Sequence, residues 1–203
     1  MLVTEIRDLG KSRCLIYIDG QSSFVLYRGE LKAYSIEEQK EITSETYDLI
    51  LSEVLAKRAR LRAMNLLMKH SFTEAKLREK LVEGFYPETI INNAIDYVSS
   101  YGYVDDVQYA YDYISYNSDK KSEKRITQDL LNKGVSRDNI KTAFEKMYDN
   151  NEHIDEEAQI RALLEKRHYN PNDSTFEDAQ KHCAFLLRKG YRMDTIRRII
   201  NLT

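Results

Sequence analysis

The feature of this chain that most constrains its fold is a short phrase that occurs three times. The copies are LVEGFYPETI (81–90), LLNKGVSRDNI (130–140) and LLRKGYRMDTI (186–196). Each copy has a leucine three residues before a glycine and a bulky apolar residue directly after it. An acidic residue and an isoleucine come four and six positions after the glycine. A phrase repeated at intervals of about fifty residues indicates an array built from one supersecondary unit.

The phrase has the features of a corner between two helices. A glycine that closes an amphipathic stretch suits the left-handed position after a helix end, and the glycines expected there are Gly84, Gly134 and Gly190. The next helices would have their N-caps at Tyr86, Ser136 and Arg192, with Pro87 as a first helical residue. The acid would lie in the first turn, where the helix dipole favours it. The apolar residue after the glycine would pack on the isoleucine as a hydrophobic staple.

The N-terminal segment differs from the rest of the chain. Two runs rich in β-branched and aromatic residues, CLIYID and SSFVLY, flank Asp19-Gly20, which is a strong hairpin signal. Residues 2–6 could add a third strand, and so small a sheet should pack on the helical part of the chain. After the capping residues around Thr43, apolar residues at 3–4 spacing predict one long helix over 44–69, bent near Lys57.

These patterns predict a mainly α fold. We expect three tandem three-helix repeats in an elongated, curved array, preceded by a small N-terminal β-hairpin or three-stranded β element. The predicted division is 1–43 for the β-rich extension, then 44–103, 104–153 and 154–203 for the repeats. Polar linkers at 115–123 and 167–175, expected to be mobile, join the first and second helices of the last two repeats.

Residues that carry chemistry are scarce. We find no Gly-rich phosphate loop or nucleophile elbow, and the four histidines lack metal-ligand spacing, so no catalytic, metal or cofactor residues are predicted. His182 is interpreted as a surface histidine beside a buried Cys183. The two cysteines are interpreted as buried thiols, with a disulfide left open. Without a signal peptide or a long apolar run, we expect a cytoplasmic protein that does not enter the membrane.

Charge is more informative than motif, because basic clusters recur beside the corners. A single cluster is more often a solvated helix face, but three in one array favour a surface that meets a polyanion or an acidic protein groove. The candidate contact residues are Arg58, Arg62, Lys76, Arg78, Lys124, Arg125, Arg188, Lys189, Arg197 and Arg198.

Tyrosine is overused, with 15 in 203 residues and no tryptophan. Tyr109, Tyr113 and Tyr116 share one helical face. We expect them to fill the seam between the first two repeats. The alternative is an aromatic patch for a protein partner or for stacked bases.

Several of these stretches resemble the RecX family of bacterial recombination regulators. They are AMNLLMKHSFTEAKLREKLVEGF (63–85), YGYVDDVQYA (101–110), RITQDLLNKGV (125–135) and FLLRKGYRMDTIRRII (185–200). The front of the chain, with IYIDG and FVLYRGEL, is similar to the N-terminal extension of the family's Gram-positive-type members.

The resemblance implies a non-enzymatic, modular helical protein that binds the RecA filament on DNA. Such proteins lie in the filament groove and restrain ATP hydrolysis, strand exchange and co-protease activity. We expect a monomer without cofactor, with weak direct DNA binding. The alternative is a helical DNA-binding module that acts mainly through phosphate-backbone contacts, against which the net charge of -2 counts. A hydrolase or metalloenzyme is kept as a formal third reading.

Overall fold

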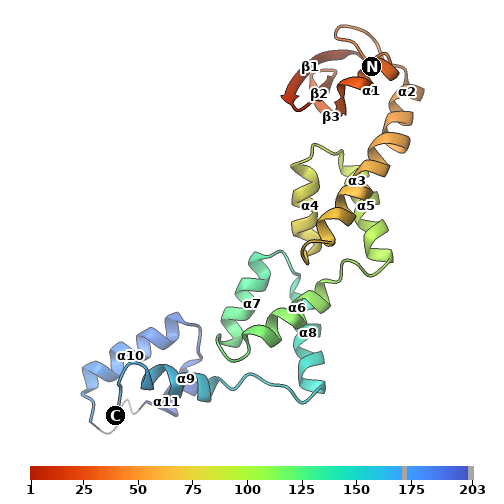
Figure 1. The fold of residues 1–203 in the computed structure, drawn as a ribbon. Coiled ribbons are helices and arrows are strands. Elements are labelled where there is room, and N and C mark those ends of the chain that lie inside the picture. Colours follow the sequence, from red (N-terminus) through yellow and green to blue (C-terminus); the bar gives the residue numbers. More distant parts are fainter. Residues whose placement is uncertain (171–172, 201–203) are drawn as a thin grey trace. The chain divides into compact units, whose positions relative to one another are not determined.

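The computed structural model describes residues 1–170 and 173–200. The chain divides into two compact units, Met1–Asp105 and Asp106–Thr203 (Figure 1). The predicted fold class is confirmed, because a three-stranded sheet at the N-terminus is followed by helices throughout the described part of the chain. The curvature of the array and the exact repeat boundaries stay predictions.

The first unit begins with an antiparallel sheet in the order β1-β2-β3. Its strands are β1 (Val3–Gly10), β2 (Arg13–Ile18) and β3 (Gln21–Tyr27). Asp19 and Gly20 both have positive φ, 50° and 81°, as a two-residue hairpin turn of the primed type requires. The predicted hairpin and third strand are therefore both present. A short helix, α1 (Arg28–Ala33), comes directly after β3.

The predicted long helix is present but is wider in its middle than an α-helix. It comprises α2 (Ser44–Leu49), the π-helical segment η1 (Ile50–Leu55) and α3 (Ala56–Leu67), joined through residues in the right-handed helical conformation. Thr43 caps it, its side-chain oxygen accepting from the Thr46 amide. This irregularity lies before the bend that we expected near Lys57. The π-helical turn allows Ile50 and Leu55, which are five residues apart, both to be buried.

The remaining helices complete three modules of three. The first module is α2-η1-α3 with α4 (Glu74–Val82) and α5 (Glu88–Ser100). The second is α6 (Asp106–Asn117), α7 (Glu123–Asn132) and α8 (Arg137–Asp149). The third is α9 (Glu156–Glu165), α10 (Phe176–Arg188) and α11 (Met193–Arg197).

Each unit has its own buried core. In the first unit the inner face of the sheet and the first module form one cluster, which includes Phe24, Leu26, Ile50, Leu77 and Ile95. The sheet therefore packs on the helices of the first module, as predicted. In the second unit the second module packs around Ile114 and Leu130, and the third around Ile160 and Leu186.

Two of the three corners match the prediction. Gly134 and Gly190 have φ values of 85° and 95°, and α8 and α11 have their N-caps at Ser136 and Arg192. The apolar residues of both predicted staples are buried at these corners, namely Val135, Ile140, Tyr191 and Ile196.

The prediction for the first corner is wrong by one residue. Phe85, not Gly84, has the left-handed conformation, with φ 60°, and the N-cap of α5 is Pro87 rather than Tyr86. The turn after α4 continues one residue further, since the Phe85 amide donates to the carbonyl of Val82. Gly84 is needed for space instead, because a Cβ there would lie 2.7 Å from Cε2 of the Tyr86 ring.

Candidate contact surfaces

The second and third modules meet at a polar joint built on the linker between α6 and α7. The side-chain amide of Gln159 on α9 donates to the carbonyls of Ser118 (2.6 Å) and Lys121 (3.2 Å). The Tyr191 hydroxyl in turn donates to Oε1 of Gln159 at 2.8 Å. Gln159 and Tyr191 are only 8% and 3% exposed. The expectation of a mobile linker is wrong here, because its carbonyls are bound by the third module. The second predicted linker covers residues 167–175, and its residues 171–172 lie outside the described residues.

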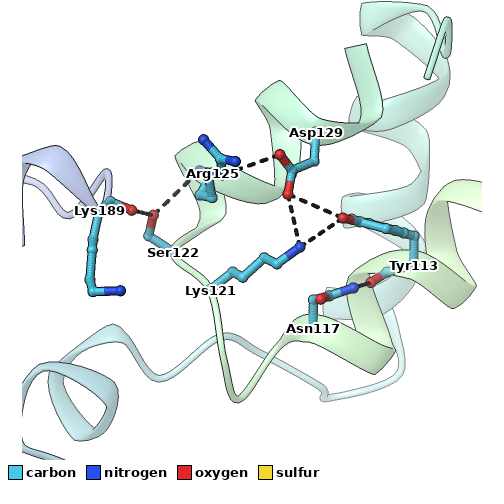
Figure 2. A network of polar contacts seen from close by, with 7 residues as sticks. All are labelled: Tyr113, Asn117, Lys121, Ser122, Arg125, Asp129 and Lys189. Carbon is cyan, nitrogen blue, oxygen red and sulfur yellow. Dashed lines mark hydrogen bonds and ion pairs between the residues drawn. The ribbon is translucent and has the colours of Figure 1, made fainter. Parts of the chain in front are cut away.

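A second contact at the joint involves the N-terminus of α7. The Ser122 hydroxyl caps this helix by accepting from the Arg125 amide, and it donates to the Lys189 carbonyl at 2.9 Å (Figure 2). A Cβ at Gly190 would lie 2.6 Å from Oγ of Ser122 and 3.6 Å from Cβ of Lys124. The corner of the third module therefore lies directly against the first turn of α7.

This contact brings two of the predicted basic clusters together. The backbone at Lys189 and Gly190 lies against the first turn of α7. Lys124 and Arg125 on α7 and Arg188 and Lys189 at the end of α10 therefore come from neighbouring segments, although more than sixty residues separate them in the sequence. All four side chains are at exposed positions. We call these four residues the joint surface. The sequence shows both clusters but not their proximity.

An acidic group behind the joint surface organises part of it. Asp129 accepts from Nζ of Lys121 at 2.9 Å and from the Tyr113 hydroxyl at 3.1 Å, and it forms an ion pair with Nε of Arg125 at 3.1 Å (Figure 2). Burial raises the pKa of the Asp129 carboxyl, but the hydrogen bonds from Lys121 and Tyr113 outweigh it, and the pKa is lowered overall. The ionised carboxylate thus ties α6, the linker and α7 together, and it offsets part of the Arg125 charge.

The tyrosines of α6 divide between core and surface. Tyr109 and Tyr113 are half-buried against the core of the second module itself, whereas Tyr116 is 73% exposed with the Lys120 ammonium 4.1 Å from its ring centroid. Tyr113 therefore has a structural role within its own module. The seam with the first repeat stays a prediction.

Other predicted contact residues of the second unit differ in how far their charges are offset. Arg198 is paired with Glu157 at 2.8 Å, while Arg197 is at an exposed position. Within the described part of the unit, Lys124, Arg188 and Arg197 have no acidic partner. A cavity of about 800 Å³ beside α7 is lined by cations and acids together, including Lys124, Arg192 and Glu156, so its charge is mixed. Arg192, predicted from the sequence as an N-cap and as one of the cations of the C-terminal helices, thus lines this cavity.

In the first unit most of the predicted cations have internal partners. The Arg58 guanidinium lies 4.7 Å from the Tyr27 ring centroid, donates to the Val25 carbonyl and pairs with Glu30. Lys76 pairs with Glu79, and Arg78 pairs with Glu74. Arg58 is thus a structural link between α3 and the N-terminal segment. Arg62 is the one predicted cation of this unit that forms no salt bridge among residues 1–170 and 173–200.

Neither cysteine nor histidine forms a site in the described part of the chain. Cys14 and Cys183 are free and buried, as interpreted from the sequence. His182 is not a simple surface residue, because its ring lies 4.6 Å from that of Tyr169 and burial lowers its pKa. Within the described ranges no group of three or more His, Cys, Asp or Glu side chains is placed to hold a metal ion. No helix there is both long and apolar enough to cross a membrane.

The fold and these surfaces define a class of protein: tandem three-helix modules with charged residues at exposed positions. A family model described as "RecX, third three-helix domain" matches residues 155–200. A regulatory protein RecX from Caldanaerobacter subterraneus subsp. tengcongensis is 31% identical over 205 residues, covering 100% of both chains. The chain belongs to the RecX family of regulatory proteins, and so it is a regulatory protein and not an enzyme.

Further comparisons agree over most of the chain's length. A regulatory protein RecX from Clostridioides difficile is 28% identical, covering 98% of this chain and 94% of its own. A crystal structure of regulatory protein RecX superposes with a TM-score of 0.63 at 22% identity, covering 98% of both chains. The structural match supports the fold alone.

Proposed function

We propose that this protein binds the filament that the RecA recombinase forms on DNA and inhibits its ATPase, strand-exchange and co-protease activities, in the control of recombination and repair. The observation that carries the proposal is the match to a regulatory protein RecX along the entire chain. The modular fold is compatible with it, since several modules can contact more than one protomer of a filament, which raises the effective concentration of each contact.

Within this proposal, the joint surface is the contact face. Its four cations come from two modules that the Gln159, Tyr191 and Ser122 hydrogen bonds hold in one arrangement. A cationic face that is organised before binding loses less conformational entropy on association. It would meet acidic protein surface or exposed DNA backbone in the filament.

The test is a titration of the DNA-dependent ATPase of a cognate RecA. The unmodified protein should inhibit the ATPase at or below stoichiometric amounts. A Lys124→Glu/Lys189→Glu variant should need at least about tenfold more protein, because like charges would then face each other across the contact. A Lys141→Glu/Lys166→Glu variant changes net charge equally at exposed positions outside the joint surface and serves as the control. Absence of inhibition by the unmodified protein would refute the proposed function.

Direct DNA binding is a second candidate function, favoured by exposed cations that lack an acidic partner in the described chain. It predicts DNA affinity without RecA that falls steeply with salt, because each phosphate contact releases a counterion. Undetectable binding at low salt would rule it out.

We further propose that the protein acts in the cytoplasm as a monomer, and analytical ultracentrifugation at micromolar concentration tests the oligomeric state.

A further inference from the structure

A basic cleft in the first unit lies between the sheet, α3 and the end of α4. It has a volume of about 340 Å³, and one acid, Glu83, lies in its lining. The lining also includes four cations and two aromatic rings: Arg13, Arg58, Arg62, Lys80, Tyr27 and Tyr86. Only Arg58 and Arg62 belong to the predicted contact residues. Arg13 lies in a strand and Lys80 beside a corner, so no run of basic sequence connects the four.

The charges in this cleft are unevenly offset. Lys80 donates to both carboxylate oxygens of Glu83 at 2.8 Å, and Arg58 pairs with Glu30. Arg13 and Arg62 form no salt bridge among the residues that the structure describes, although the charge of Arg62 helps to lower the pKa of the Glu83 carboxyl. The cleft therefore holds two guanidinium groups that form no salt bridge there, and each can bind an oxyanion through two parallel N–H donors.

Two tyrosine rings line the same cleft, and the Arg58 guanidinium lies 4.7 Å from the centroid of one of them, Tyr27. Arg13 and Tyr27 are paired across β2 and β3, so their side chains emerge on the same face of the sheet. Tyr27 is 43% exposed, while the Tyr86 ring is half-buried and rests on Gly84. Gly84 thus has a role in shaping the cleft, because any side chain there would displace the Tyr86 ring.

We propose that this cleft binds single-stranded nucleic acid, with a backbone phosphate on Arg13 and Arg62 and a neighbouring base against Tyr86 or Tyr27. Proteins bind single-stranded nucleic acid by placing cations along its backbone and aromatic rings on which its bases stack. An acidic peptide would use the cations but would leave the rings and the apolar wall at Val25 without a partner. The inference concerns the first unit and is independent of the RecA contact proposed for the joint surface.

The test is fluorescence anisotropy of a fluorescein-labelled oligothymidylate with the full-length protein at low salt, without RecA. An Arg13→Ala/Arg62→Ala variant should bind at least about tenfold more weakly. Its log-log salt slope should be shallower by about 0.7, because the contact to one phosphate is lost. Tyr86→Leu should weaken binding about 5-fold or more while leaving the salt slope unchanged. As a control, a Lys57→Ala variant should bind like the unmodified protein, because Lys57 is at an exposed position of α3, the helix that carries Arg62, but does not line the cleft.

Two results would overturn the assignment. One is oligonucleotide binding that the arginine variant leaves unchanged while its circular dichroism shows an intact fold. The other is a labelled polyglutamate peptide that binds more tightly than the oligonucleotide and loses affinity in the same variant, which would assign the cleft to an acidic protein. Normal RecA inhibition by the cleft variant, together with loss of oligonucleotide binding, would separate this site from the proposed function.

Discussion

Gly84 and Gly190 occupy the same place in a repeated phrase, but they are glycine for different reasons. Gly190 has a left-handed backbone and lies against Ser122 of the preceding module. Gly84 has no left-handed conformation and makes room for the Tyr86 ring. The left-handed role could be predicted for Gly134 and Gly190 from the end of an amphipathic stretch. The role of Gly84 could not, since it depends on where a ring packs in three dimensions.

Gly190→Ala should destabilise the second unit by about 2–4 kcal/mol, from left-handed strain and from overpacking against Ser122. Gly102→Ala is the matched control, because Gly102 also has positive φ, but a Cβ there meets nothing within 4 Å. It should cost only about 1 kcal/mol. Urea unfolding at neutral pH measures both. Equal costs for the two variants would show that the close approach to Ser122 contributes nothing.

Gly84→Ala should cost about 1–3 kcal/mol, because the Tyr86 ring has to move away from the new Cβ. In a Tyr86→Ala background the same change should cost much less, since the ring is no longer there. A double-mutant cycle on the free energy of unfolding measures this coupling. A cost of Gly84→Ala that is the same in both backgrounds would contradict the packing explanation.

A similar limit applies to the charged residues. Local pairs such as Glu74 with Arg78 can be read from their spacing along a helix. The partner of Arg58 is Glu30, which lies 28 residues away in a short helix that no sequence pattern predicted. Sequence reasoning therefore placed Arg58 on a contact surface, whereas the fold uses it internally.

At the scale of elements, the linker between α6 and α7 shows why mobility predicted from polar composition was wrong. Its residues are polar, but Gln159 of another module binds two of its carbonyls and Ser122 holds its end. Gln159 resembles any exposed glutamine in the sequence. Only the packed structure shows that it is buried and shared between the linker and the Tyr191 hydroxyl.

The Tyr191 hydroxyl should make the second unit sensitive to alkaline pH. Burial, with a smaller effect from Glu156, raises its pKa from 10.0 to about 12. The unfolded chain therefore loses this proton first, and the free energy of unfolding falls as pH rises from about 10 to about 12. Tyr191→Phe should cost about 1 kcal/mol at neutral pH through the lost bond to Gln159. Urea unfolding at neutral pH and near pH 11 should show the gap between the two proteins narrowing, and a gap that widens would refute the assignment.

At the scale of the whole molecule, the buried clusters lie on one side or the other of the division after Asp105. The sheet and the first module form one cluster, whereas the clusters of the second and third modules lie within the second unit. The repeated phrase was enough to predict the fold class and the number of modules. It could not predict which modules dock through polar contacts, because a few single groups outside the phrase, such as Gln159 and Ser122, decide this.

Fragments 1–105 and 106–203, expressed separately, should each be helical by circular dichroism and unfold cooperatively, because each keeps its core. Their thermal midpoints should lie within a few degrees of transitions of the intact protein. A fragment that begins at residue 154 is the control, since it loses the linker that binds Gln159 and should be clearly less stable. A fragment 106–203 that fails to fold while 154–203 does so would contradict this division.

The joint between the last two modules also limits how such a chain can be rearranged. Copies of one phrase suggest units that could be duplicated, deleted or exchanged. The third module, however, presents Gln159 to the second, with the Tyr191 hydroxyl bound to Gln159, and Val135 stands in the second corner where Tyr191 stands in the third. A copy of the second module placed last would carry neither Gln159 nor Tyr191, so the Ser118 and Lys121 carbonyls of its neighbour would lose their side-chain donor. The modules of this protein share a plan but have become non-interchangeable parts.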